Sequence, residues 1–344
     1  MEKFRDKIFN EEVFETYRNT LPSTKENSLI KNALFKNVNN YKAKMSEQSG
    51  GYAVVEPIKG RIGGNPVNYD GNTDIPAGSE RDTFYQRKIC YGRAKAWGEY
   101  DFASDITGTN FKAEAQEVNE YWDEQRQATV LAILAGIFGM TGGVNGQFVS
   151  KHTYDIKGEA TPTLTADALN KASQKALGDK KAKLDVIFMH SAVSTNLEGL
   201  NLIDFLKYTD ANGIERDLTI GTFNGRLVIV DDDMPVTTDS TGDIYTSYVF
   251  QKGFFEYENI GAEVPSEVAR NAYEKGGKTD LITRVREMIV PTLISYKGTG
   301  SVSPTNEAFA TGSNWELANN DKEGGSKVYV DDKLIPVARI ISRG

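Results

Sequence analysis

Residues 111–138 carry the strongest helix signal in this chain of 344 residues. The stretch FKAEAQEVNEYWDEQRQATVLAILAGIF has no proline, a single glycine and many strong helix formers. Ala115, Val118 and Trp122 begin an apolar face with helical spacing, and the second half of the stretch is apolar all round. At the rise of an α-helix its length would be roughly 42 Å. We therefore expect a long strut, half exposed and half buried, which Gly139 ends.

Residues 51–100 predict a long hairpin. Two β-prone runs, 52–62 and 83–102, flank the segment GGNPVNYDGNTDIPAGSE, which is rich in turn residues. Neither run has enough consecutive apolar residues to bury the hairpin in a core of its own. We expect an arm that projects from the body and packs on something else.

Two further elements are well marked between residues 163 and 191. Residues 163–178 predict a helix, with Thr165 as the N-cap and Gly178 as the stop. KLDVIFMHS, residues 183–191, predicts a buried strand.

The remaining segments mix strands, one helix and loops. Asn224-Gly225, between two β-prone runs, is the best hairpin turn in the chain. We also expect a helical stretch at 192–206 with breaks at Gly199 and Asn201, and a strand pair around Gly253. A polar loop at 266–280 should lead into a long extended run at 281–298, with Pro291 at an edge or bulge. A loop at 298–313 and two final strands within 327–342 complete the expected elements. Hairpin-paired strands with a few separate helices place the chain in the α+β class.

The composition removes several functional classes. A single cysteine, Cys90, excludes a disulfide within the chain and indicates synthesis in a reducing compartment. Two histidines, His152 and His190, exclude a multi-histidine metal site, and a Ser-His or Cys-His pair would have to use one of them. We read His190 as a core or cap residue. The net charge of −8 argues against general attraction to nucleic acid.

Signals for membrane insertion or export are also missing from the sequence. The N-terminus is charged and has no apolar stretch of the kind found in signal peptides. The longest apolar run, residues 128–140, is shorter than the roughly 20 residues that a bilayer requires. We expect a soluble protein without a membrane or a cofactor.

The stretch GRLVIVDDDMP, residues 225–235, is the best candidate for chemistry. Successive side chains of an extended chain point to opposite faces, so only Asp231 and Asp233 could share a metal, while Asp232 would point away. One interpretation is a carboxylate-based, metal-dependent hydrolase. The interpretation we favour is a buried strand that ends in a solvated acidic turn.

The predicted hairpin is rich in cations. They are either a solvated surface or, as we prefer, contacts to an acidic neighbouring subunit, because a projecting arm needs an external partner. These side chains are Lys59, Arg61, Arg81, Arg87, Lys88, Arg93 and Lys95. We expect the three aspartates to lie at a contact between subunits as well.

The order of these parts resembles the major capsid proteins of tailed bacteriophages, which have the Hong Kong 97 fold. The segments that carry the resemblance are AKAWGEYDFASDITGTN, EVNEYWDEQRQATVLAILAGIFG, LDVIFMHSAVSTNLEGLNLIDF, TFNGRLVIVDDDMP and TRVREMIVPTLISYKG. Each segment is weak alone, but in this order they cover nearly the whole chain after residue 50.

The resemblance implies an α+β capsid fold with five parts. These are an N-terminal arm (1–50), an extended loop formed by a long β-hairpin (51–100), a peripheral domain with a spine helix (101–154, helix about 111–138), an axial domain (155–280) and the C-terminal part of the peripheral domain (281–344). It also explains why the arm, the hairpin and the strut lack partners within the chain, since their partners would be other copies.

The implied function is a structural one in the virion. Subunits would assemble as hexamers and pentamers into an icosahedral shell around double-stranded DNA, without specific recognition of that DNA. Residues 1–50 are too short and mixed for the scaffolding segment of some members, so we expect a separate scaffolding protein. The other expected partners are a portal and a decoration protein, and synthesis is expected in the cytoplasm of the bacterial host. An encapsulin-like compartment is the alternative within the same fold.

Overall fold

The computed structural model describes most of the chain after residue 34. The described residues are 35–47, 52–62, 65–72, 74–75, 81–101, 115–209, 215–321 and 327–343. The helical pieces predicted in the N-terminal arm before residue 35, and the predicted first turn of the long helix at 111–114, lie outside them.

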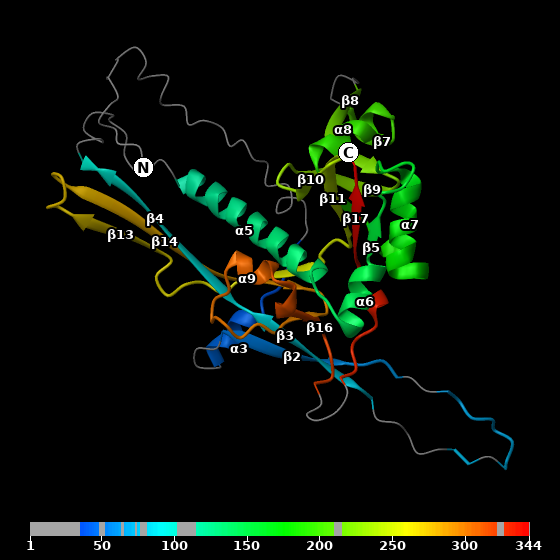
Figure 1. The fold of residues 1–344 in the computed structure, drawn as a ribbon. Helices are drawn as coiled ribbons and strands as arrows, with labels where there is room; N and C mark the ends of the chain where they lie inside the picture. Colours follow the sequence, from blue (N-terminus) through cyan, green and yellow to red (C-terminus); the bar gives the residue numbers. More distant parts are fainter. Residues whose placement is uncertain are drawn as a thin grey trace.

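The long helix α5 (Ala115–Phe138) runs through the middle of the molecule and ends where the sequence predicts (Figure 1). Its second half is mostly buried, with Ile133 and Ile137 at 0% exposure, although Ala128 and Ala135 are exposed. Gly136 lets a short helix, α9 (Asn306–Ala310), pack directly on α5, because a Cβ at this position would lie 2.0 Å from the carbonyl oxygen of Phe309.

A sheet of eight described strands forms one lobe, at the upper right of Figure 1. Its path runs through β5 (Thr153–Asp155), β17 (Val337–Ser342), β11 (Gly242–Phe250), β6 (Val186–Met189), β9 (Arg226–Val230), β8 (Glu215–Phe223) and β7 (Ile203–Thr209), with β10 (Val236–Asp239) pairing β11. One face packs against α7 (Ala166–Leu177) and α8 (Ser191–Gly199), and the other face joins the core around α5.

The other lobe contains a second sheet, in which the long strand β14 is the centre. Its members are β1 (Phe35–Asn37), β12 (Phe255–Asn259), β14 (Lys278–Pro291), β13 (Ser266–Asn271) and β4 (Tyr91–Tyr100). Tyr91 and Ile289 of this sheet share a core with Phe188 and Phe250 of the first sheet. Because α5 lies in that common core, the helix braces the two lobes against each other.

The predicted hairpin is present as β2 (Ala53–Lys59) and β3 (Thr83–Ile89). Its base packs on the second lobe, next to α3 (Tyr41–Glu47), and the described parts of its distal end project away from the body (Figure 1). Smaller elements complete the described chain: α6 (Gly143–Lys151), β15 (Ile294–Tyr296), β16 (Trp315–Leu317) and the 3-10 helices η3 (Gly178–Lys183), η4 (Gly312–Asn314) and η5 (Asp332–Leu334).

Several predicted elements are confirmed. Helix α7 begins after Thr165, whose side chain accepts a hydrogen bond from the Ala168 amide, and it ends at Gly178. All four residues of β6 are buried. Asn224 and Gly225 both have positive φ, at 50° and 73°, which is the backbone that a two-residue hairpin turn requires.

Other predictions are wrong, and the reasons are physical. The helix predicted over 192–206 ends at Gly199, and β7 begins at Ile203. The polar loop predicted at 266–280 is the strand β13 with the start of β14; β13 is exposed along its whole length, so it lacks the apolar alternation of a half-buried strand.

The C-terminal predictions need three corrections. The strands on either side of Gly253, β11 and β12, do not pair with each other, because the turn carries the chain from one sheet to the other. The loop predicted at 298–313 contains α9, whose N-cap is Thr305. Of the two final strands predicted within 327–342, only β17 forms, whereas Tyr329 makes an isolated bridge.

No single helix in the described part of the chain is long and apolar enough to cross a bilayer, although α5 and α6 pass that test together across a bend of 113°.

Candidate functional site

The aspartate turn after β9 is only partly the solvated corner that the sequence predicts, because Asp232 and Asp233 are exposed but Asp231 is buried. Asp231 is only 7% exposed. One carboxylate oxygen accepts a hydrogen bond of 2.7 Å from Nε2 of Gln127, and the other accepts one of 2.9 Å from the Asp233 amide. Gln127 lies in the middle of α5, so Asp231 ties the end of the eight-stranded sheet to the long helix.

Burial raises the pKa of Asp231 above its usual value, and the donated hydrogen bonds only partly oppose this effect. Oε1 of Gln127 is buried and has no hydrogen-bond partner among the described residues. The contact between sheet and helix therefore contains a carboxylate that is costly to ionise and an amide oxygen that is not satisfied.

The neighbouring aspartates behave differently. The side chain of Asp232 is 74% exposed and lies 3.8 Å from Nε2 of His190. A hydrogen bond from the Ser191 side chain lowers the pKa of Asp232. Asp233 is exposed at the surface.

These positions do not make a metal site. Asp231 points into the protein toward α5, whereas Asp232 lies beside α8 at the surface. Within the described ranges, no three His, Cys, Asp or Glu residues are placed so that they could hold a metal ion. The divergence of the carboxylates gives no support to a metal-dependent hydrolase.

The two histidines have structural positions. His190 is the N-cap of α8, as predicted, and its Nδ1 accepts a hydrogen bond from the Ala192 amide. His152 is buried beside Phe148, with Nδ1 2.6 Å from the carbonyl oxygen of Val337. Burial lowers the pKa of His152, so this ring is held in its neutral form.

Three of the seven hairpin cations are held within the chain. Lys88 is 4% exposed and lies in a cluster with Glu56, at 2.5 Å, Glu256, at 2.9 Å, and the Tyr41 hydroxyl. Arg87 donates to the carbonyl oxygens of Tyr296 and Gly298, and Arg93 donates to the carbonyl oxygen of Pro304 and to Asn306. The other four cations, Lys59, Arg61, Arg81 and Lys95, are exposed.

The Lys88 cluster fixes the base of the hairpin. Burial by itself would raise the pKa of Glu56 and of Glu256. Hydrogen bonds from Lys88 and Lys44 to Glu56, and from Tyr41 and Lys88 to Glu256, outweigh burial, and both pKa values are lowered. Glu258 adds a second tie, because its carboxylate accepts the amides of Tyr41 and Lys42 at the start of α3.

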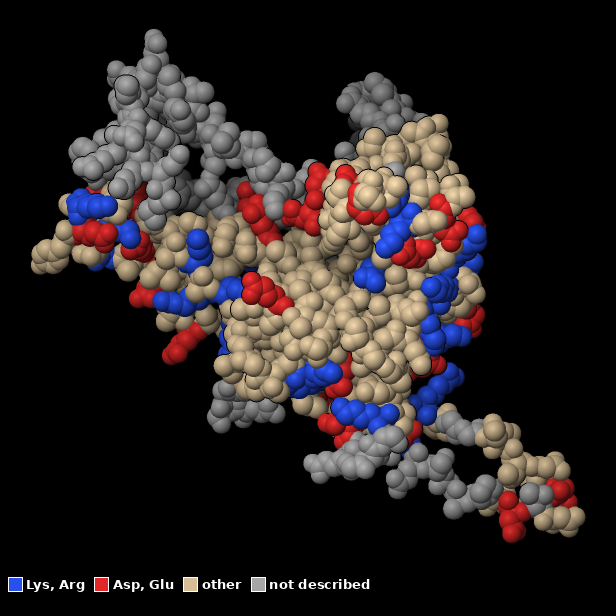
Figure 2. All heavy atoms as spheres, viewed as in Figure 1, with Lys and Arg blue, Asp and Glu red and all other residues tan. Residues whose placement is uncertain are grey.

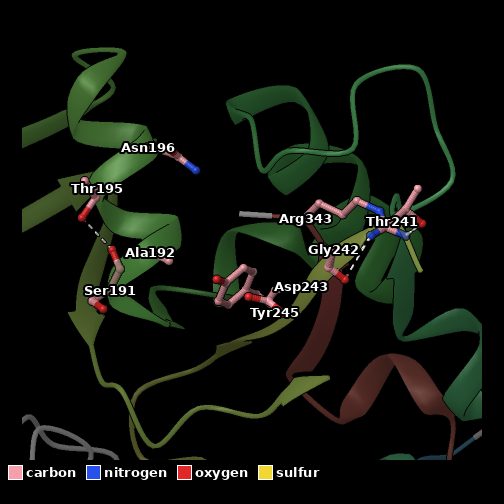
Figure 3. Close-up of a pocket in the computed structure, with 9 residues that line it drawn as sticks. All are labelled: Ser191, Ala192, Thr195, Asn196, Thr241, Gly242, Asp243, Tyr245 and Arg343. Carbon is pink, nitrogen blue, oxygen red and sulfur yellow. Dashed lines mark hydrogen bonds between the residues drawn. The ribbon is translucent and has the colours of Figure 1, made fainter. Parts of the chain in front are cut away.

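An open hollow of about 570 Å³ lies between α8 and the β10–β11 turn, and Figure 3 shows the residues that line it. The Thr195 hydroxyl donates to the carbonyl oxygen of Ser191, and Arg343 is held by Asp239 at 2.6 Å. Thr195 and Arg343 are thus engaged with their own neighbours, and the hollow is an open, polar part of the surface.

Sequence reasoning missed both tertiary clusters. Gln127 is a polar residue at the border between the amphipathic and the apolar half of the long helix. A polar side chain at that position is the one sequence feature that could have indicated a buried hydrogen bond from Gln127. The partners of Lys88 lie up to 168 residues away from it in the sequence, and no local pattern joins them.

The comparisons with known proteins agree with one another. No family model matches the chain. The chain is 31% identical over 277 residues to the major capsid protein of Bacillus phage SPP1, across 76% of this chain and 81% of that protein.

Solved structures show the same fold. The cyanophage Pam1 capsid matches with a TM-score of 0.55 at 9% identity, over 90% of this chain and 88% of that chain. The head of Helicobacter pylori bacteriophage KHP40 matches with a TM-score of 0.55 at 11% identity, over 99% of both chains. Mycobacterium phage Bobi matches with a TM-score of 0.52 at 16% identity, over 95% of this chain and 94% of that chain.

Proposed function

The chain belongs to the major capsid proteins of tailed bacteriophages, and from this premise we propose that it builds hexamers and pentamers of an icosahedral head around double-stranded DNA. It is a structural protein of the phage head shell and not an enzyme, it self-assembles, and its place is the virion capsid. The relationship to a phage coat protein favours a head over an encapsulin-like compartment.

The projecting hairpin is the observation on which the mode of assembly rests. Its described distal part exposes large apolar side chains, with Tyr69 at 92%, Ile62 at 76% and Ile75 at 75%. A free subunit gains nothing from such exposure, whereas a second copy would bury these side chains at roughly 25 cal/mol per Å² of apolar surface.

The parts of the subunit follow from the two sheets. In this proposal the arm and the extended loop keep their boundaries at 1–50 and 51–100. The peripheral domain consists of α5 and the strands β12, β13 and β14, onto whose sheet β1 of the arm and β4 of the extended loop are added, and the axial domain is the eight-stranded lobe, including β17. Strand pairing, and not order along the chain, sets this division.

The exposed cations of the hairpin would meet acidic groups of a neighbouring subunit. Lys59 and Arg61 are exposed on the hairpin, and Asp232 is exposed beside α8. If these groups meet, Lys59→Gln/Arg61→Gln should slow assembly, and most strongly at low salt. Lys252→Gln/Lys297→Gln removes the same charge from exposed positions elsewhere and is the matched control.

Further partners belong to the same proposal. A separate scaffolding protein would guide the shell, a portal would occupy one vertex, and a decoration protein could bind outside. The net charge of −8 fits an inner wall along which packaged DNA slides without being bound. Synthesis in the host cytoplasm fits the single, buried cysteine.

Electron microscopy of the purified protein, alone and with the scaffolding protein of the same phage, tests the proposal. We expect closed shells with fivefold and sixfold clusters of subunits. A protein that stays monomeric under both conditions would contradict it.

A further inference from the structure

A cluster of lysines surrounds the C-terminal end of α7. Residues 171–184 contain five lysines and one aspartate, a net charge of +4 within a chain whose net charge is −8. Three of these lysines lie in η3, which follows α7 directly. A further cation, Lys333 of η5, lies over the helix end, because its Nζ is 3.5 Å from where a Cβ at Gly178 would stand. The cationic edge, as we call this surface, consists of Lys180, Lys181, Lys183 and Lys333.

The lysines of the cationic edge lack counter-charges. In the described part of the chain, no carboxylate forms an ion pair with any of the four, whereas the neighbouring Lys151 and Lys171 pair with Asp332, at 2.5 Å, and Asp167, at 2.7 Å. Three of the four are exposed and Lys180 is half-buried. Figure 2 shows Lys and Arg atoms gathered on the side of the eight-stranded lobe where α7 lies in Figure 1.

A buried guanidinium lies beneath the junction of α7 and η3. Arg226, at the start of β9, is 6% exposed and donates to the carbonyl oxygen of Leu184 and to the Ser173 hydroxyl, both at 3.0 Å. Among the described residues no carboxylate pairs with it, and burial lowers its pKa. A buried cation with only neutral partners adds positive potential to the surface above it, and an anion that arrives there is attracted by both.

The cationic edge offers charge without an apolar anchor. Residues 166–185 are all described, and none of their large apolar side chains is exposed. Leu334 of η5, at 45%, is the one exposed apolar side chain beside Lys333 in the sequence. Contacts between exposed charges are weak and are screened by salt. A permanent interface between subunits has a packed apolar centre, so the chemistry of this surface favours a partner that binds and leaves.

Double-stranded DNA fits the charge of the cationic edge but not its surroundings. Exposed carboxylates lie close by, those of Asp167 in the first turn of α7, Asp179 within η3 and Asp331 at the start of η5. DNA is a stiff rod that carries one negative charge per about 1.7 Å, so it would lie across these carboxylates as well. A short, flexible acidic segment can follow the lysines alone.

We propose that the cationic edge binds an acidic segment of a second protein, one that differs from this chain and associates with it reversibly. Aspartates or glutamates of that segment contact the four lysines, and the guanidinium of Arg226 adds to the attraction from below. The contact belongs to the single subunit, so it is tested without a shell and does not depend on the proposed function.

Fluorescence anisotropy of a labelled peptide of about 12 glutamates, titrated with the unassembled subunit, tests the contact. We expect binding at low salt that weakens strongly at about 0.15 M salt, because ions screen exposed charges. Lys180→Gln/Lys181→Gln/Lys183→Gln should weaken the binding about tenfold, since each exposed ion pair contributes a factor of about two.

Two controls accompany the titration. Lys42→Gln/Lys59→Gln/Lys297→Gln removes the same charge from exposed positions elsewhere, and should leave the affinity within about twofold. Thermal melting reports whether the variants fold. If the triple variant of the cationic edge melts at a lower temperature, Lys181→Gln/Lys183→Gln, which keeps the half-buried Lys180, takes its place and should also weaken binding.

Three results would overturn the proposal. The first is a peptide that does not bind at low salt, or that binds equally well to the edge variant and to the control variant. The second is a short DNA duplex that binds more tightly than the peptide and depends on the same lysines, which would make the edge a nucleic-acid surface. The third is an edge variant that folds but no longer forms shells by itself, which would make the edge an interface between copies. Failure of the unchanged chain to form shells would instead contradict the proposed function and leave the titration as the test of this contact.

Discussion

The base and the tip of the hairpin are opposites within one element. At the base, Lys88 is 4% exposed and is surrounded by carboxylates and a tyrosine hydroxyl of its own chain. At the tip, Tyr69 is 92% exposed. The base is stabilised by the subunit's own fold, whereas the tip offers apolar and acidic groups that another copy can bury. Damage to the base should therefore act on the stability of the subunit, and damage to the tip on assembly.

The largest effect on stability is expected from Lys88→Met. Removing the ammonium leaves Glu56 with Lys44 and Glu256 with the Tyr41 hydroxyl, and takes away the one cation between the two carboxylates, which should lower the free energy of unfolding by about 3 kcal/mol. Urea unfolding of the unassembled subunit measures it. Lys59→Met, at the exposed end of β2, is the control and should change stability by less than about 0.5 kcal/mol. Equal losses of stability in Lys88→Met and Lys59→Met would contradict the proposed difference between the base and the distal part of the hairpin.

Asp231→Ala extends the comparison to a second internal anchor. It leaves Nε2 of Gln127 buried without its acceptor, and should cost about 2 kcal/mol. Asp232→Ala, one residue along and 74% exposed, should cost clearly less. The same unfolding experiment compares the two variants. A larger loss of stability in Asp232→Ala than in Asp231→Ala would show that the contact between Asp231 and Gln127 does not stabilise the fold.

Asp231→Asn tests the raised pKa of Asp231 through the pH dependence of stability. Because burial raises the pKa of Asp231 in the folded state, the protonated form is favoured by folding. This contribution is fully present below the usual carboxyl pKa of about 4 and is lost as the pH rises through the raised pKa. Asparagine mimics the protonated form: its Oδ1 accepts from the Asp233 amide, and its Nδ2 donates to Oε1 of Gln127 once the Gln127 side-chain amide is turned over.

Asp231→Asn should therefore be more stable than the unchanged chain at pH 7, by about 1 kcal/mol, and the difference should shrink as the pH falls toward 4. Melting temperatures between pH 4 and pH 8 measure it. Asp243→Asn, at an exposed position, is the control. Parallel curves for Asp231→Asn and the unchanged chain would rule out a raised pKa.

The smallest effect on the subunit is expected at the tip. Tyr69→Ser/Ile75→Ser should change the free energy of unfolding by less than about 0.5 kcal/mol, because both side chains are already in water. The same variant should reduce shell formation about tenfold. Sedimentation of assembly mixtures measures shell formation. A tip variant that is less stable than the unchanged chain but assembles normally would contradict the proposed difference between base and tip.

Local signals made much of the fold predictable. The long helix, the Thr165 cap and the Asn224-Gly225 turn are each set by a few neighbouring residues, and all three are confirmed. Strand β13 was missed because an edge strand that is exposed on both faces has no apolar period.

The site was less predictable, because its contacts are distant in sequence. Asp231 and Gln127 are 104 residues apart, and nothing around either residue indicates the other. The sequence correctly marks the three aspartates as the end of a strand, but whether each one is buried depends on where the long helix lies. The same reason hides the partners of Lys88.

The most direct test of the central claim is electron cryomicroscopy of assembled shells at a resolution that traces the hairpin. The account predicts hexamers and pentamers in which the distal part of each hairpin, with Tyr69 and Ile75, is buried against a neighbouring subunit. Shells in which the tip contacts no other subunit would contradict it.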